Sequence, residues 1–276
     1  MKYGIAVRNM GPQSTAATLR ACVSAAEALG YDAVFVSDHL CIPPDDTEGS
    51  GGRYLDVLAT LAFLAGITTR IRLGISVLVL PYRPAVLTAK QVATIQELSA
   101  GRMILGVGVG WMKREFAALG VDKRMRARLS DETLRVLTRL FAQDVAEYHG
   151  ELVDFPPFVF APRPPLPPIW IGGNGGPALR RVMEFGAGWH PMLPADKLQP
   201  MVGELKERLR GAGRPDSIDI VVRRGLRLED TAAARARLAT EQAAGATYFI
   251  LDLGRYPSEK EFIAQAETFM TKVASA

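Results

Sequence analysis

The chain has 276 residues, of which 48% are apolar and 22% charged, a composition typical of a folded protein with a sizeable core. Its net charge is +4, and its lysines and arginines are scattered along the sequence. This pattern argues against a nucleic-acid partner and fits a basic rim around an anionic small molecule. No stretch approaches 18 uninterrupted apolar residues, so we expect no membrane partner.

The cysteine content and the N-terminus point to a reducing compartment. Two cysteines, Cys22 and Cys41, are too few for a disulfide framework, and the apolar run Met1–Val7 is too short for a signal peptide. We therefore expect a cytoplasmic protein.

Strand and helix patterns alternate along the first half of the chain. Ser14 is the expected N-cap of the first helix and Gly30 its stop signal. The polar loop from Cys41 to Arg53 is long for a compact domain, which favours a functional role. The predicted elements are strand Tyr3–Val7, helix Ser14–Leu29, strand Ala33–Ser37, helix Tyr54–Gly66, strand Ile71–Leu80, helix Ala85–Leu98, strand Met103–Val109 and a largely helical stretch from Glu115 to Phe141.

The second half opens with a change of pattern. The alternation in Glu147–Phe155 breaks at His149-Gly150 and predicts a β-hairpin, within a proline-rich insertion at about residues 146–168. The elements that follow are strand Ile169–Ile171, helix Ala178–Phe185, strand Gly188–Met192, helix Lys197–Leu209, strand Ile218–Leu228, helix Thr231–Ala244, strand Tyr248–Leu253 and helix Glu259–Val273.

Eight strands, each followed by a helix, match the count of a (β/α)8 TIM barrel. The predicted fold is therefore α/β, a single barrel domain over residues 1–276 with the hairpin as an insertion on its rim. Two Rossmann-like halves are the alternative, but neither half has a dinucleotide-binding glycine loop. Because barrel chemistry lies at the carboxyl ends of the strands, these ends define the candidate site.

The strand Met103–Val109 carries glycines at every second position, Gly106, Gly108 and Gly110, followed by Trp111. One face of this strand therefore has no side chains, and a large flat ligand could lie against its backbone. Tight packing inside a barrel core explains the same alternation equally well.

A glycine-rich loop, Gly172-Gly-Asn-Gly-Gly176, joins a buried strand to a helix that begins at Pro177. Such a loop offers backbone N–H groups and the positive end of a helix dipole to a phosphate. The simpler interpretation is a tight turn, although four glycines in five residues exceed what a turn needs.

The other strand ends carry Asp38-His39, Ser76-Val77 and His190. They contain no nucleophile–base pair of the hydrolase type and no metal-ligand spacing, so no metal site is predicted. Asp38 could simply cap its loop, and His190 is as readily a structural histidine as a polar group of a substrate pocket.

Three motifs together resemble the bacterial luciferase-like family: Asp38-His39, Ser99–Trp111 with the following Glu115, and Pro167-Pro-Ile-Trp-Ile-Gly-Gly173 with the later Gly188-Trp189. Their order and spacing match over nearly the whole chain. The opening Arg8-Asn-Met-Gly-Pro12 resembles the branch that uses the deazaflavin coenzyme F420, whereas FMN-using members share the same scaffold.

The resemblance implies a site residue by residue. His39 would be the catalytic proton donor or base, and Asp38 would contact the cofactor ring. A cis peptide would lie at Ser76-Val77. The other expected cofactor contacts are Gly106 and Gly108 near the ring, and Gly172, Gly173, Asn174, Gly175 and Gly176 around the phosphate. Trp111 and His190 would line the substrate pocket.

Two positions depart from the sugar-phosphate dehydrogenases of the family. Trp111 stands where those enzymes have a glutamate, and Arg114 where they have an asparagine. The resemblance therefore predicts an F420-dependent oxidoreductase that acts on a small organic substrate other than a sugar phosphate. An FMN-dependent monooxygenase using O₂ and a non-catalytic flavin-binding protein are the alternatives. The implied partners are a second copy of the chain in a homodimer and a flavin reductase or F420-reducing system as electron source.

Overall fold

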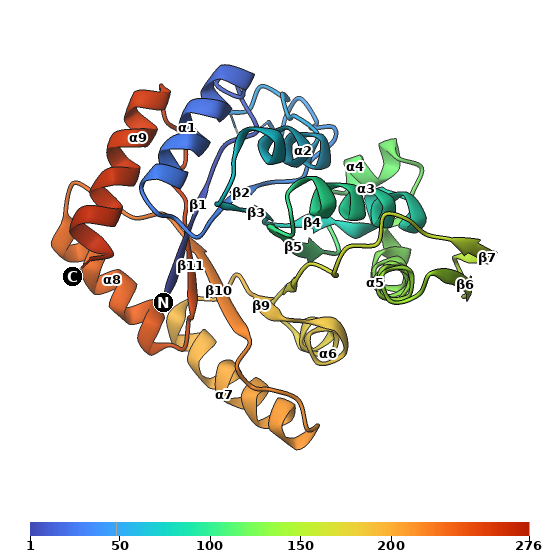
Figure 1. The fold of residues 1–276 in the computed structure, drawn as a ribbon. Coiled ribbons are helices and arrows are strands. Elements are labelled where there is room, and N and C mark those ends of the chain that lie inside the picture. Colours follow the sequence, from blue (N-terminus) through green and yellow to red (C-terminus); the bar gives the residue numbers. More distant parts are fainter. Residues whose placement is uncertain (48, 276) are drawn as a thin grey trace.

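The computed structural model describes residues 1–47 and 49–275. Its main strands are β1 (Lys2–Ala6), β2 (Ala33–Val36), β3 (Arg72–Ile75), β4 (Leu78–Val79), β5 (Met103–Gly108), β8 (Ile169–Gly172), β9 (Gly188–His190), β10 (Asp219–Arg224) and β11 (Tyr248–Leu251). They pair in the order β3-β2-β1-β11-β10-β9-β8-β5-β4, and β3 also pairs with β5 and closes the ring. Because β3 and β4 are two pieces of one barrel strand, the described residues form an eight-stranded parallel barrel, as predicted (Figure 1).

Helices pack around the outside of the barrel (Figure 1). Their bounds are α1 (Ala16–Ala28), α2 (Val57–Ile67), α3 (Ala85–Leu98), α4 (Lys113–Ala118), α5 (Arg126–Ala142), α6 (Gly176–Phe185), α7 (Ala195–Gly211), α8 (Thr231–Ala243) and α9 (Glu259–Thr268). Short 3₁₀ helices lie at Leu80–Tyr82 and Lys123–Met125, and a π-helix at Phe269–Val273 follows α9. The expected N-cap Ser14 is wrong: Thr15 accepts from Thr18 N–H, while the Ser14 hydroxyl donates to the carbonyl of Gly11.

Aromatic rings fill the middle of the barrel. Phe35 stacks on Trp170 at 5.5 Å between ring centroids, and Tyr248 meets Trp170 edge-on at 4.7 Å. Glycines on neighbouring strands make room for these rings, since a Cβ at Gly74 would lie 2.1 Å from Phe35 and one at Gly188 2.5 Å from Trp170. The barrel is therefore a packed core below its mouth, and ligands must bind at an end.

The predicted strand Ile71–Leu80 is interrupted. β3 ends at Ile75, β4 starts at Leu78, and the peptide bond between Ser76 and Val77 is cis. The cis bond implied by the family resemblance is thus present, whereas the continuous strand expected from the apolar pattern is not.

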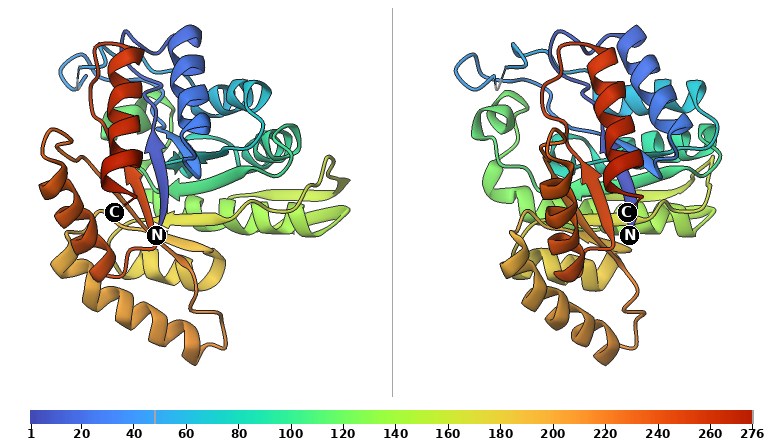
Figure 2. Two further views of the ribbon diagram at one scale, coloured as in Figure 1. Left: turned by 60° about the vertical axis from the view of Figure 1, so that its left-hand side comes forward. Right: turned by 90° about the vertical axis from the view of Figure 1, so that its left-hand side faces the viewer.

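The predicted hairpin is confirmed as β6 (Val145–His149) and β7 (Asp154–Val159), which pair antiparallel. It follows α5 and precedes β8, so it lies at the amino-terminal end of the barrel. The insertion is therefore on the rim opposite to the mouth, and residues 146–168 do not line the cavity beside Trp111. In the left view of Figure 2 the hairpin projects from the side opposite to residues 41–47 and 49–53.

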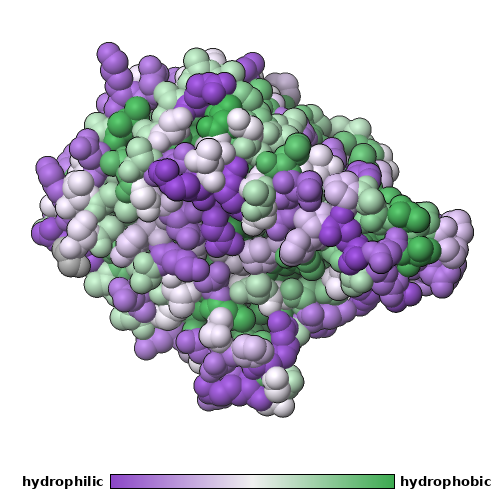
Figure 3. Space-filling model, in the orientation of Figure 1, coloured by the Kyte–Doolittle hydropathy of each residue, from purple (hydrophilic) through white to green (hydrophobic). Residues whose placement is uncertain are grey.

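Apolar surface gathers on the end of the molecule from which the hairpin projects (Figure 3). Val145 and Val159 pair across the hairpin and are 57% and 71% exposed. Among residues 1–47 and 49–275, no helix has the length and apolar content to span a bilayer.

Candidate functional site

A layer of polar side chains lies above the aromatic core, at the carboxyl ends of the strands. Its centre is the Arg223 guanidinium, whose Nε donates to Asp252 at 2.9 Å. Nη1 of Arg223 donates to the Ser37 hydroxyl at 3.1 Å and to the Ser76 carbonyl at 3.1 Å. One arginine on β10 therefore ties together the ends of β2, β3 and β11. We call Ser37, Ser76, His190, Arg223 and Asp252 the polar layer.

His190 is an interior member of the polar layer. Its Nδ1 lies 3.2 Å from the carbonyl of Val221, which can only accept, and its Nε2 lies 2.9 Å from the Ser76 hydroxyl. Burial, and then the charge of Arg223, lower the pKa of His190 to about 4, so the ring is neutral near pH 7. Both ring nitrogens of His190 are bonded within the protein, and only 5% of the residue is exposed. These contacts favour a structural histidine over a polar group that lines the substrate pocket.

His39 lies at the end of β2 and pairs with a carboxylate. Its Nδ1 is 3.0 Å from Oε2 of Glu115, and its side chain is 18% exposed. The ring meets Tyr54 at 5.1 Å and Trp111 at 6.3 Å between centroids, both edge-on. An ionised carboxylate only accepts, so the contact assigns the proton to Nδ1 and makes Nε2 the nitrogen that changes protonation.

Glu115 is fully buried and anchors the start of the loop 41–53. Oε2 also accepts from the Tyr82 hydroxyl at 2.7 Å, while Oε1 accepts from the backbone N–H groups of Leu40 and Cys41. Burial alone would raise the pKa of Glu115, but the hydrogen bonds from His39, Leu40 and Tyr82 outweigh it and lower that pKa. Glu115 is therefore an anion that orients His39.

Asp38 is paired within the protein. Its two oxygens accept from Arg83 at 2.7 and 2.8 Å, Oδ2 also accepts from Val79 N–H at 2.9 Å, and the side chain is fully buried. Arg83 reaches on to Asp56, the N-cap of α2, at 2.9 Å. Asp38 thus joins the end of β2 to β4 and α2, with both oxygens used by protein donors, and its contact with a cofactor ring stays a prediction.

Asp38→Asn should lower the free energy of unfolding by about 1.5–3 kcal/mol, the range for hydrogen bonds to charged groups, because Arg83 keeps Asp56. Urea unfolding monitored by tryptophan fluorescence measures this loss. Cofactor affinity per folded molecule should stay unchanged. If Asp38→Asn left stability unchanged and weakened cofactor binding, Asp38 would be a contact of the cofactor ring and not a structural residue.

The bare face of β5 is filled from within the protein. A Cβ at Gly106 would lie 2.0 Å from the Ile75 carbonyl oxygen, and one at Gly108 would lie 2.7 Å from Val77 Cγ2. These glycines therefore accommodate the break between β3 and β4, which supports the core-packing interpretation. Val77 covers Gly106 and Gly108. Contact of these two glycines with a cofactor remains a prediction.

The loop 172–176 contains two kinds of glycine. At Gly172 a Cβ would meet the Val107 carbonyl at 2.9 Å, and Gly173 has a φ of +126°, so both are required by the backbone. Gly175 and Gly176 are not: a Cβ would meet Pro177 at 3.8 Å at the first and nothing within 4 Å at the second. Because these two glycines have no side chains, the N-terminus of α6 stays open to a ligand, as a phosphate site requires.

Asn174 has a tethering role in this loop. Its Oδ1 accepts from Met192 N–H at 2.7 Å, and the Trp189 indole donates to the Gly173 carbonyl at 2.8 Å. The loop is thus held by the end of β9, and Asn174 Oδ1 is already used by the backbone.

Trp111 borders a cavity of about 490 Å³ at the mouth, between the loop 41–53 and the start of α4. The indole-bearing residue is 57% exposed. The cavity is lined by Pro43, Asp45, Asp46, Trp111, Met112, Lys113 and Arg114. This position agrees with the expected place of Trp111 in a substrate pocket, and it identifies Arg114, which pairs with Asp45, as a neighbour of that pocket.

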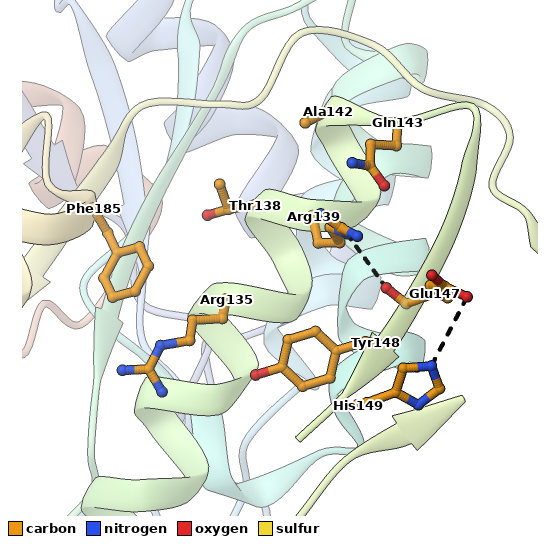
Figure 4. A pocket seen from close by; sticks show the side chains of 9 residues that line it. All are labelled: Arg135, Thr138, Arg139, Ala142, Gln143, Glu147, Tyr148, His149 and Phe185. Atoms are coloured by element: carbon orange, nitrogen blue, oxygen red, sulfur yellow. Dashed lines mark hydrogen bonds and ion pairs between the residues drawn. The ribbon is translucent and has the colours of Figure 1, made fainter. Parts of the chain in front are cut away.

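A second cavity, of about 510 Å³, lies between α5, the hairpin and the end of α6 (Figure 4). Its lining includes Arg135, Tyr148 and Phe185. This cavity is at the amino-terminal end of the barrel, away from the motifs at the strand ends, so the mouth remains the candidate site. In the described residues no three His, Cys, Asp or Glu side chains form a group that could hold a metal ion.

Sequence comparison assigns the chain to a family. A family model described as luciferase-like monooxygenase matches residues 1–272. The chain belongs to this family. An uncharacterized protein of Mycobacterium tuberculosis is 31% identical over 72% of this chain and 73% of its own length.

Relatives with named activities fall into two groups. An F420-dependent glucose-6-phosphate dehydrogenase of Amycolatopsis mediterranei is 34% identical over 65% of this chain and 56% of its own length. An FMNH(2)-dependent dimethylsulfone monooxygenase of Pseudomonas putida is 34% identical over 46% of this chain and 36% of its own. The barrel also superposes on an F420-dependent secondary alcohol dehydrogenase with a TM-score of 0.84 at 16% identity, covering 99% of this chain and 98% of that one. This luciferase-like protein is thus an oxidoreductase by family, with F420- and FMN-dependent relatives.

Proposed function

We propose that the protein is an F420-dependent oxidoreductase that transfers hydride between the deazaflavin and a small organic substrate. The observation that carries the proposal is the pair His39–Glu115 at the mouth, 3.0 Å apart, beside Trp111 and its cavity. A bound deazaflavin supplies hydride transfer at its ring carbon, and the protein must supply orientation and a proton. His39 Nε2 provides or removes that proton, and Glu115 holds the tautomer.

The residues at the mouth fit such a cofactor. The open N-terminus of α6 at Gly175 and Gly176 would hold the phosphate, and Val77 offers an apolar surface for the ring. The similarity to an F420-dependent relative covers 65% of the chain, against 46% for the FMN-dependent one, which favours F420. Trp111 argues against a sugar phosphate as substrate.

An FMN-dependent monooxygenase is the second candidate, supported by the dimethylsulfone monooxygenase relative. Titration of the purified protein with coenzyme F420 and with FMN, each oxidised and reduced, separates the two. We expect micromolar or tighter binding of F420, weaker binding of FMN, and reduction of bound F420 by a substrate without consumption of O₂. Tight FMN binding with O₂ uptake would replace the proposal by the alternative, and binding without turnover of any substrate would leave a non-catalytic binder. The electron source is accordingly an F420-reducing system or a flavin reductase.

Gly175→Asp should weaken cofactor binding at least about tenfold, since a carboxylate would then repel the phosphate at the helix N-terminus. The fold should survive: Gly175 is the N-cap of α6 with φ −121°, and aspartate is a favoured N-cap residue. Gly175→Ser is the matched neutral control. Equal affinities in both variants and the wild type would remove this loop from the site.

We also propose that the protein forms a homodimer. The exposed apolar side chains Leu87 and Leu98 on α3 and Val145 and Val159 on the hairpin offer surface for a second copy. Light scattering at micromolar concentration should give twice the 29.9 kDa chain mass. A monomer mass would contradict this expectation.

A further inference from the structure

The cavity beside Trp111 lies between two walls that belong to distant parts of the chain. One wall comes from residues 42–47, which we call the flap, and the other is the segment Trp111–Arg114. Trp111 in turn meets the His39 ring at 6.3 Å between centroids. The flap therefore borders a space that adjoins the histidine assigned to proton transfer.

The chain is anchored on both sides of the flap. Before it, the N–H groups of Leu40 and Cys41 donate to the buried carboxylate of Glu115. After it, Arg53 donates from Nε to the Ser14 hydroxyl and from Nη2 to the Ser14 carbonyl, both at 3.0 Å. The flap is thus held between two fixed points.

The flap itself is bonded to the opposite wall of the cavity by one ion pair. The Asp45 carboxylate accepts from Nη1 of Arg114, and both residues line the cavity. The other hydrogen bonds of the flap, in the part of the chain that the structure describes, stay within the loop 41–53. Among these residues no second polar contact duplicates the pair.

The strength of this pair decides whether the flap is a fixed wall or a movable one. The hydrogen bond from Arg114 lowers the pKa of Asp45, so both partners are charged near pH 7. Their side chains are 63% and 65% exposed. An ion pair this exposed is screened by salt and favours the closed arrangement by a factor of about five at most. The flap can therefore open without disturbing its two anchors.

We propose that the flap is a gate over the cavity beside Trp111, and that the ion pair between Arg114 and Asp45 is its latch. Opening the gate admits substrate, and closing it excludes water from the space beside His39. That His39 is the destination of the substrate rests on the proposed function. The gate and its latch do not depend on a cofactor.

A fluorophore on the flap tests the gate. In a background with Cys41→Ser and Pro44→Cys, bimane is attached at the exposed position 44, while Cys22 is fully buried and stays unlabelled. The Trp111 indole quenches bimane on contact, so a closed gate is dim. Trp111→Phe gives the unquenched limit.

Breaking the latch should brighten the label. Arg114→Met and Asp45→Asn should each raise the ratio of open to closed flap about two- to fivefold. Exchanging the charges, with Asp45→Arg and Arg114→Asp together, should restore the quenching. Raising the ionic strength from about 0.05 to 1 M should open the wild-type gate and leave Arg114→Met unchanged.

Acrylamide gives a second measurement on the unlabelled protein. Trp111 is 57% exposed, whereas Trp170 and Trp189 are fully buried, so quenching of the tryptophan fluorescence reports access to Trp111. Both single variants should be quenched more strongly than the wild type. Arg208→Met, which removes an exposed ion pair on α7, is the matched control and should behave as the wild type in both measurements.

Equal bimane fluorescence in the wild type and both single variants would overturn the latch. Failure of the charge exchange to restore quenching would do the same. A label as bright in the wild type as in Trp111→Phe would overturn the closed arrangement. Because neither measurement uses a cofactor, a responsive gate in a protein that binds neither F420 nor FMN would refute the proposed function alone. F420 binding with an unresponsive flap would refute only the gate.

Discussion

Replacing His39 is expected to lower the single-turnover rate of hydride transfer by about 10²–10⁴, the range for loss of a positioned general acid or base. Cofactor affinity should change little, because proton transfer matters in the transition state and contributes little to ground-state binding. His39→Asn is the sharper variant, because its amide can still donate to Glu115 and keep the loop 41–53 anchored. His39→Ala removes that contact as well.

Stopped-flow measurement of the cofactor absorbance, as a function of pH, tests this role. Both variants should lose rate to a similar extent, and the wild-type profile should show an ionisation between about pH 5 and 8 that both variants lack. His149→Ala, on the exposed hairpin at the opposite end, is the control and should match the wild type. A His39→Asn variant with normal rate would reduce His39 to an anchor of its loop.

The barrel could be predicted from the sequence because its strands are buried on both faces. Each reads as a short apolar run between turn residues, and the inward aromatic rings of Phe35 and Trp170 do not disturb that pattern. The break in the third strand could not be predicted from the apolar pattern. The local residues are compatible with a continuous strand, and the contacts at Ser76 come from Arg223, 147 residues away.

The order of the elements alone predicts at which end of the barrel the hairpin lies. A segment between a helix and the next strand returns to the amino-terminal end of a barrel, whereas active-site loops follow strands. The proline content of residues 156–168 indicates a rim segment but does not distinguish the two ends of the barrel.

Site residues whose surroundings are local in sequence could be predicted, whereas those with partners far along the chain could not. Gly175 and Gly176 keep their expected exposure because the loop sequence itself determines it. The pairing of Asp38 with Arg83 cannot be predicted from local sequence, because Arg83 lies 45 residues further along the chain, beyond a strand break. The sequence does carry a signal for Arg223 and Asp252: Arg223 is the second-last residue of β10 and Asp252 directly follows β11, both at positions where side-chain alternation points inward.

Glu115→Gln is expected to reduce the hydride-transfer rate nearly as much as loss of His39, by about 10²–10⁴. The glutamine oxygen should remain with the N–H groups of Leu40 and Cys41, which turns its NH₂ toward Tyr82 and His39. Nδ1 of His39 must then accept, and its proton moves to Nε2. The imidazole is still present in the wrong tautomer, so cofactor binding persists while proton exchange fails.

The difference in stability between the wild type and this variant depends on pH, and the lowered pKa of Glu115 in the wild type determines its sign. Because folding lowers that pKa, the ionised carboxylate stabilises the protein fully above its ordinary pKa of about 4.3, and the stabilisation is lost as the pH falls through the lower folded value. The wild type should therefore exceed Glu115→Gln in unfolding free energy by about 1–3 kcal/mol at pH 7. Below about pH 4 the gap should close.

Tyr82→Phe separates the two functions of Glu115. It removes one hydrogen bond to Oε2, at a cost of about 1 kcal/mol, but leaves the carboxylate and hence the His39 tautomer intact. Its rate should therefore stay within a few-fold of the wild type while its stability falls. If Tyr82→Phe and Glu115→Gln lost rate in proportion to their stability, the pair His39–Glu115 would be a structural contact and the proton would have to come from elsewhere at the mouth.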